Sequence, residues 1–101
     1  MRRVVPLLLV AALTACSGAP SSDASGEEIY RQLCASCHAR DLSGGVGPSL
    51  VPDSNATTLD DEVLAATIRD GRGSRMPAFG GTLDEAQLTR LIGYLRSQQR
   101  P

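Results

Sequence analysis

The chain of 101 residues is long enough for one domain at most, and its ten basic residues are all arginine. Its eleven acidic residues leave a formal net charge of −1. Nucleic-acid binding requires clustered positive charge on a domain of high isoelectric point, so this charge balance excludes it.

The N-terminal segment has the layout of an export signal. Two arginines follow the first methionine, an apolar run extends from Val4 to Leu13, and small residues precede Cys16. The run has about half of the ~20 residues that cross a bilayer, so a membrane span is rejected. The ending "LTAC" resembles a bacterial lipobox, in which Cys16 is acylated and becomes the first mature residue; the alternative is an ordinary signal with an incidental cysteine. Residues 1–15 are therefore predicted to be a lipoprotein signal peptide.

Residues 16–25 are predicted to be the lipidated cysteine and a flexible tether, because "SGAPSSDAS" contains small and polar residues with nothing to bury. Nine such residues hold their ends roughly 15–18 Å apart on average. The mature chain would keep eight arginines and eleven acidic residues, a formal charge of −3. We expect an exported, periplasm-facing protein that is lipid-anchored to a bacterial membrane. Ser17 after the cysteine resembles lipoproteins sorted to the outer membrane.

Three capping-box patterns, each a Ser or Thr followed three residues later by an acidic residue, predict three helices. The patterns are Ser25–Glu28, Thr58–Asp61 and Thr82–Glu85. Apolar residues at helical spacing follow them: Ile29, Tyr30 and Leu33; Leu59, Val63, Leu64, Ala66 and Ile68; and Leu88, Leu91, Ile92 and Leu95. Gly71 is expected to end the second helix. Strand-like alternation is absent from the sequence, so the prediction is an all-α fold.

The predicted folded part, residues 26–99, has two long loops rich in Gly, Pro and Ser, at residues 40–57 and 71–81. Domains of this size bury only ~60% of their chain surface and usually need an additional staple. Long loops in so small a domain also indicate that something other than backbone fills its centre. A large apolar prosthetic group would meet both requirements.

The run "CASCH" places Cys34, Cys37 and His38 within five residues. Cys-x-x-Cys-His is the attachment signature of c-type haem. Each thiol adds to one porphyrin vinyl group, and the following histidine lies under the iron as a ligand. The alternatives are a thioredoxin-like redox pair, which belongs near a strand-helix-strand unit; a zinc site, which needs four ligands; and a structural disulfide, which leaves His38 unexplained.

The sixth iron ligand is predicted to be Met76. His38 is the only histidine, lysine is absent, and Met76 is the only methionine of the mature chain. It lies in the Gly-rich loop that would cover the far face of the ring. His/Met coordination is an electron-transfer arrangement that raises the reduction potential. The alternatives are a methionine that fills a gap in the core and an iron left open on that side.

Residues 26–99 resemble a small class I c-type cytochrome. "GEEIYRQLCASCH" is similar to that family's first helix and haem motif, "MPAF" to its methionine loop and "LIGYL" to its last helix. The resemblance implies a small cytochrome c fold of about three main helices around one covalently bound haem c. It also implies that the Pro48 carbonyl in "GPSL" accepts a hydrogen bond from the His38 ring, and that Gly26 and Tyr94 mark a close crossing of the first and last helices.

The chain departs from some branches of that family because it has no tryptophan to bond the haem propionates. Arg69, Arg72 and Arg75 are candidates, since guanidinium groups match carboxylates. The alternative is that these arginines are solvated surface charge.

An iron held by protein on both faces has no vacant site for a substrate. The expected function is therefore electron transfer, not catalysis: a membrane-tethered relay of single electrons between membrane-associated or periplasmic redox proteins. We expect Ala35, Ala78 and Phe79 around the exposed haem edge, with Arg72 and Arg75 steering an acidic partner.

Three other functions stay open at this point. The chain could be the haem c subunit of a dehydrogenase or oxidase complex. It could be a ligand-binding haem sensor or peroxidase if Met76 dissociates from the iron. It could also be a structural lipoprotein with a disulfide.

Overall fold

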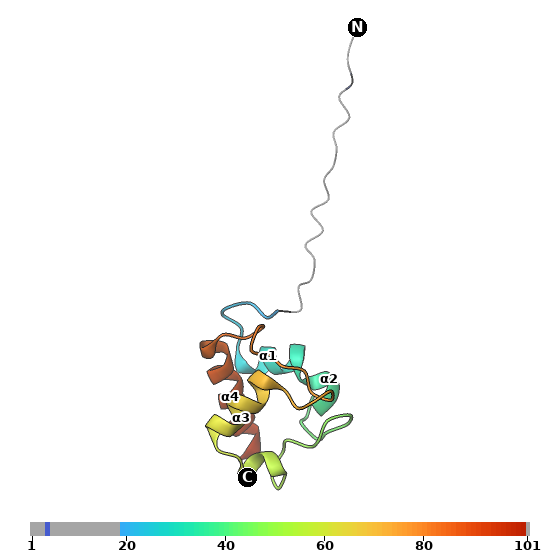
Figure 1. Cartoon of the computed structure of the whole chain (residues 1–101), viewed down its shortest axis with the longest axis vertical. Helices are drawn as coiled ribbons and strands as arrows, with labels where there is room; N and C mark the ends of the chain where they lie inside the picture. The colour runs from blue at the N-terminus through green and yellow to red at the C-terminus, as the bar shows by residue number, and fades with distance from the viewer. Residues whose placement is uncertain (1–3, 5–18, 101) are drawn as a thin grey trace.

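The computed structural model describes residue 4 and residues 19–100, and its helices form one compact bundle with α4 packed along α1 and α3 (Figure 1). The elements, in chain order, are α1 (Gly26–Leu33), α2 (Ala35–His38), the 3-10 helix η1 (Asn55–Thr58), α3 (Asp61–Asp70) and α4 (Glu85–Gln99). In these ranges the only strand-like pairing is an isolated bridge between Arg72 and Met76. The predicted all-α fold is confirmed.

The predicted signal peptide, apart from Val4, and the predicted lipidation site Cys16 lie outside the described residues. Over the part of the chain that is described, no helix has both the length and the apolar character needed to cross a membrane.

The start of α1 is the predicted one. The Ser25 hydroxyl accepts a hydrogen bond from the Glu28 N–H, and the Glu28 carboxylate accepts one from the Ser25 N–H, both at 3.1 Å. This reciprocal box satisfies two backbone donors that the first helical turn leaves unpaired.

The starts of α3 and α4 lie two residues later than predicted. Asp60 caps α3, with its carboxylate 2.8 Å from the Val63 nitrogen. Asp84 caps α4 and forms a full box with Gln87. A carboxylate caps a helix as well as a hydroxyl does and also interacts favourably with the positive end of the helix dipole. Where a threonine and an aspartate are both available, the aspartate is therefore the N-cap.

The core lies where α1 crosses α4. Ile29 and Tyr30 of α1 and Leu91 of α4 are fully buried. A β-carbon at Gly26 would lie 2.8 Å from the Tyr94 Cβ, so the close crossing that the family resemblance implied at these two residues is present. The rings of Tyr30 and Tyr94 then pack with centroids 5.6 Å apart.

The buried face of α3 differs slightly from the predicted one. Leu64, Ala65 and Ile68 face the core, whereas Val63 is 46% exposed. The apolar spacing alone permitted either rotation of this short helix, and packing against α4 selects the observed one.

Residues 20–25, here called the strap, are fastened to α4 and do not behave as the tether predicted for them. The Gln87 side-chain amide donates to the Ser21 carbonyl at 3.1 Å. The Arg90 guanidinium donates to the carbonyls of Ala24 at 2.9 Å and Ser22 at 2.7 Å. Ala24 is itself buried in the core. The folded part therefore begins at residue 20, six residues before the predicted boundary.

Candidate haem site

Cys34, Cys37 and His38 are presented by one helical turn at the junction of α1 and α2. The Cys34 carbonyl accepts hydrogen bonds from the backbone nitrogens of Cys37 at 3.2 Å and His38 at 3.0 Å. Both cysteines are free thiols and half-buried. The turn therefore holds two sulfurs and an imidazole at fixed helical spacing.

The alternatives for this turn fit the geometry less well. The two thiols are not joined in a disulfide. A structural zinc site needs four ligands, and among the described residues no three His, Cys, Asp or Glu side chains are grouped to hold a metal ion. Burial first, and then the neighbouring Cys37, raise the pKa of the Cys34 thiol to about 12. Redox-active Cys-x-x-Cys pairs have a lowered thiol pKa, so Cys34 lacks the property that such a pair needs.

The predicted hydrogen bond between His38 and Pro48 is present, with Nδ1 2.8 Å from the carbonyl oxygen. A carbonyl can only accept, so Nδ1 carries a proton in this bond and Nε2 is the ring nitrogen left for a metal. That tautomer makes Nε2 the metal-binding atom, and the bond to Pro48 fixes the ring and increases its basicity.

Gly47 lies against the His38 ring, a role that no pattern in the sequence indicates. A β-carbon on Gly47 would lie 2.7 Å from the ring Cε1, so any larger residue would displace the imidazole. The Gly47 nitrogen also donates to the Cys37 carbonyl at 2.7 Å, and the Gly44 nitrogen donates to the His38 carbonyl at 2.9 Å. The loop after α2 thus folds back onto the end of that helix.

Met76 lies in a tight loop between α3 and α4 that extends from α3 toward the α2 end of the molecule (Figure 1). The Arg72 nitrogen donates to the Met76 carbonyl at 3.0 Å, and the Met76 nitrogen donates back at 3.3 Å. Farther along, the Phe79 nitrogen donates to the Ile68 carbonyl at 3.0 Å, which ties the loop to the end of α3. The Met76 side chain is half-buried against the same core as Cys34.

The three arginines considered for the propionates are placed differently. Arg69 is engaged by Glu85, with two guanidinium nitrogens 3.1 and 3.2 Å from the carboxylate oxygens. Arg72 and Arg75, on the methionine loop, are exposed. Arg69 therefore already has a carboxylate partner, which leaves the other two as candidates.

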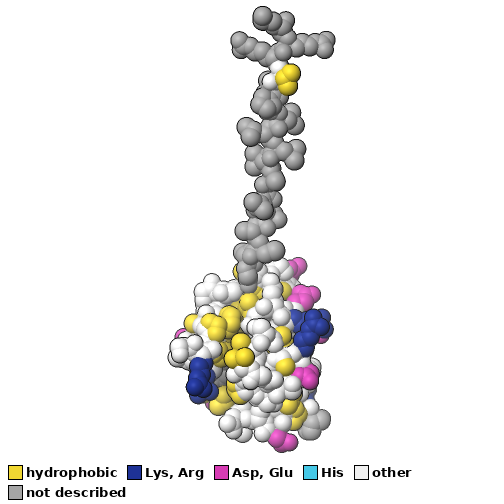
Figure 2. Space-filling model, turned by 90° about the vertical axis from the view of Figure 1, so that its right-hand side faces the viewer, with side chains coloured by type: hydrophobic (Ala, Val, Ile, Leu, Met, Phe, Trp, Pro, Cys, Tyr) yellow, Lys and Arg dark blue, Asp and Glu magenta, His cyan; other side chains and the backbone are white. Residues whose placement is uncertain are grey.

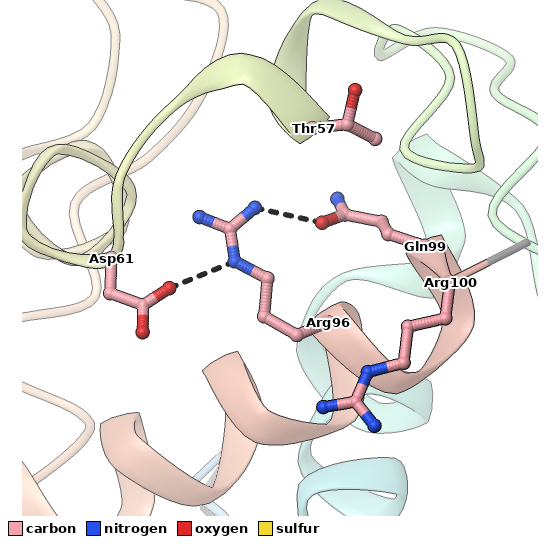
Figure 3. Close-up of a pocket in the computed structure, with 5 residues that line it drawn as sticks. All are labelled: Thr57, Asp61, Arg96, Gln99 and Arg100. Carbon is pink, nitrogen blue, oxygen red and sulfur yellow. Dashed lines mark hydrogen bonds and ion pairs between the residues drawn. The ribbon is translucent and has the colours of Figure 1, made fainter.

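A separate, open pocket of about 430 Å³ lies where α4 meets η1 and α3 (Figure 3). Its centre is Arg96, which contacts Asp61 at 2.8 Å and the Gln99 amide oxygen at 2.8 Å. The same guanidinium donates to the carbonyls of Ala56 and Leu59. None of the predicted haem-site residues lines this pocket, and we assign it a structural role.

The donor set of the α2 turn fits a c-type haem: two unpaired thiols one turn apart, followed by an imidazole whose Nε2 is free and whose Nδ1 is held. The fold and this site define a class I c-type cytochrome with one covalently bound haem. Residues 21–95 match the family described as "Cytochrome C oxidase, cbb3-type, subunit III", and the chain belongs to it.

The chain is similar to proteins of different lengths, and it covers a different share of each. The dihydro-heme d1 dehydrogenase of Pseudomonas aeruginosa is 34% identical over 77 residues, which cover 76% of this chain and 16% of that protein. Cytochrome c-551 of Halorhodospira halochloris is 33% identical over 76 residues, which cover 71% of this chain and 95% of that one. The solved structure titled c-type cytochrome NirC is similar with a TM-score of 0.63 and 32% identity, over 75% of this chain and 91% of that one.

Proposed function

We propose that this protein is an electron-transfer cytochrome that relays single electrons between larger redox proteins, and that it is not itself an enzyme. When bound, haem supplies a reversible one-electron Fe(III)/Fe(II) couple. The observation that carries the proposal is the His38 ring, whose Nδ1 is held by Pro48 beside two free thiols.

Each site residue has a distinct part in this function. Cys34 and Cys37 would form the thioether links to haem, and His38 Nε2 and Met76 Sδ would be the axial ligands. Pro48 keeps the imidazole in one orientation and tautomer. If both residues bound the iron, no coordination position would be open to a small substrate, and little would need to rearrange when an electron enters or leaves.

The proposal is tested by the optical spectrum of the full chain made in cells with haem-attachment machinery. We expect sharp reduced bands that persist after acid-acetone extraction, and a weak far-red band from a ferric iron–sulfur bond. Met76→Ala should abolish only the far-red band, and His38→Ala should abolish the six-coordinate spectrum. Rapid binding of carbon monoxide to the reduced wild type would contradict the relay and support a ligand sensor or peroxidase.

The α2 side of the molecule suits docking of a redox partner. Figure 2 looks at this side and shows hydrophobic side chains gathered in its middle, with arginine side chains on both flanks. Val46, in the loop after α2, is 89% exposed, and Ala78 of the methionine loop is also exposed. An apolar centre permits close approach, and surrounding charges orient the partner.

We propose that Arg72 and Arg75 steer a partner with an acidic surface. Both are exposed on the methionine loop, and Arg69, on α3 just before that loop, is already neutralised by Glu85. Replacing Arg72 and Arg75 by glutamine should weaken the dependence of electron-transfer rate on salt. Arg31→Gln, which removes an exposed arginine paired with Glu27 on α1, is the matched control. An unchanged salt dependence in the double variant would remove the steering role.

We also propose export and lipidation at Cys16. Only residues 17–19 separate Cys16 from Pro20, which is buried at the start of the strap, and a chain of this length spans at most about 10–15 Å. A lipid on Cys16 would therefore hold the domain close to its membrane. Mass spectrometry of the membrane-derived protein should show acyl groups on Cys16, and Cys16→Ser should move the protein to the aqueous fraction. An unmodified Cys16 would refute lipidation.

A second candidate is a haem c module that works as part of a larger oxidase or dehydrogenase. The family title names an oxidase subunit, and the match to the Pseudomonas dehydrogenase covers only 16% of that protein. Purification under mild detergent decides between the two: a stoichiometric partner supports the module, and a monomeric cytochrome supports the relay.

A further inference from the structure

Ala39, directly after His38, has a backbone conformation that alanine rarely adopts. Its φ is 69° and its ψ is 157°, a region that is populated almost only by glycine. A residue held there costs about 1–3 kcal/mol and persists only where its surroundings impose the conformation. Other groups must therefore stabilise this backbone conformation of Ala39.

The Tyr30 hydroxyl is one such group. It donates a hydrogen bond to the Ala39 carbonyl at 2.5 Å, although Tyr30 lies nine residues earlier, on α1. The same carbonyl accepts a second bond from the Leu42 nitrogen at 3.2 Å. The Tyr30 side chain is fully buried, with its ring packed on Tyr94 of α4. The helix crossing at the core is thereby linked to the peptide that leaves His38.

The conformation of Ala39 also determines where the loop after α2 goes. The Gly44 nitrogen donates to the His38 carbonyl at 2.9 Å, and the loop then delivers Pro48 to the His38 ring. If Ala39 relaxed to an ordinary conformation, the chain would leave α2 in another direction and Pro48 would lose its position. The Tyr30 hydroxyl on α1 therefore influences the position of the His38 imidazole through the strained backbone of Ala39 and the loop that follows it.

We propose that Tyr30 is a positioning residue for His38. Its hydroxyl binds the carbonyl of Ala39, whose backbone is strained, and so fixes the loop that orients the imidazole. The proposal rests on the axial role given to His38 under Proposed function. Its effect on the iron is indirect, because Tyr30 contacts the segment after the ligand and not the ligand ring.

The test compares Tyr30→Phe with Tyr94→Phe in the haem-loaded full chain. Each variant removes one hydroxyl from the same pair of packed rings, which are tilted by 51°, so Tyr94→Phe is the control for removing a hydroxyl at this helix crossing. The measurements are amide hydrogen exchange at Leu42 and Gly44, the reduction potential and denaturant unfolding. We expect Tyr30→Phe to accelerate exchange at both amides roughly tenfold beyond any change at α4, and to shift the potential. Tyr94→Phe should do neither.

Ala39→Gly provides the decisive second variant. Glycine adopts the observed conformation without strain, so Tyr30→Phe should have a much smaller effect on exchange and potential in the Ala39→Gly background. If Tyr30→Phe does not accumulate alone, its recovery by Ala39→Gly supports the proposal, and continued failure of the double variant overturns it.

Equal effects of Tyr30→Phe and Tyr94→Phe, or an undiminished Tyr30→Phe effect with Ala39→Gly, would also overturn it. The ligand question is decided separately, by the spectrum of His38→Ala. Amide exchange at Leu42 and Gly44 reports the hold on the loop whichever residue binds the iron.

Discussion

Gly26 and Arg90 meet where α1 crosses α4, and a β-carbon on Gly26 would lie 2.1 Å from the Arg90 carbonyl oxygen. The opposing atom is backbone, so it cannot rotate away. Gly26→Ala should separate the two helices and destabilise the protein by about 1–3 kcal/mol, measured by denaturant unfolding.

Gly93 is the matched control for this substitution. It lies on the exposed side of α4, where an added β-carbon meets no atom within 4 Å. Gly93→Ala should stabilise the protein by about 0.5–1 kcal/mol, because alanine has the higher helix propensity. Equal effects of the two substitutions would show that the crossing tolerates a side chain.

The helix caps show how far local sequence determines local structure. Near residue 25 the sequence offers one strong capping pattern, and Ser25 with Glu28 forms it. Before α3 and α4, a threonine and an aspartate two residues apart are both favourable N-cap residues, and Asp60 and Asp84 cap the helices. Sequence therefore identified every main helix but did not distinguish between neighbouring caps, which depend on how the incoming loop packs.

The strap could not be predicted for a different reason. Its sequence has almost nothing apolar to bury, and its attachment to α4 consists of side-chain donors bonded to backbone carbonyls, which every residue carries. At the site, the haem motif was readable because its chemistry needs fixed residue types. Gly47 and Tyr30 act through a missing β-carbon and a single hydroxyl, and neither produces a sequence pattern.

Arg90→Ala should release the strap. It removes the donors to the Ser22 and Ala24 carbonyls, at an expected cost of about 1–2 kcal/mol. The strap should become a site of limited proteolysis, and the Ala24 amide should exchange faster. The control Arg31→Ala, which breaks an exposed pair with Glu27, should cost less than about 0.5 kcal/mol. A strap that still resists proteolysis in Arg90→Ala would contradict its assigned attachment.

Arg96 should matter far more than its ion pair with Asp61. Arg96→Ala leaves the Ala56 and Leu59 carbonyls without their donor and should cost about 2–3 kcal/mol in denaturant unfolding. Asp61→Asn should cost less than about 1 kcal/mol, because the Asp61 side chain is 71% exposed. The Arg96→Ala loss should persist in high salt, since two of its partners are uncharged carbonyls. A loss that disappears in salt would mean that the ion pair dominates.

Tyr30 should make the protein sensitive to alkali. Burial first, with smaller contributions from Cys34, Tyr94 and Asp41, raises the pKa of the Tyr30 hydroxyl to about 12. In the unfolded chain the pKa returns to about 10. Above pH 10 the unfolded state therefore loses a proton that the folded state keeps, and stability falls as the pH rises toward 12. Unfolding of Tyr30→Phe should depend less on pH over this interval than that of Tyr94→Phe, and equal slopes would contradict the assignment.

Gly71 should be required for the methionine loop. Its φ of 73° is a conformation that other residues rarely adopt, and a β-carbon there would lie 2.5 Å from the Met76 carbonyl oxygen. Gly71→Ala should therefore displace Met76 and weaken the far-red iron–sulfur band. The reduction potential should fall, because methionine ligation raises it. Gly73 has a φ of 56° but open space around it, so Gly73→Ala carries the backbone strain without the collision. Loss of the far-red band in Gly71→Ala alone would show that the space beside the Met76 carbonyl is needed to place the methionine. A full far-red band in both variants would contradict this requirement for Gly71.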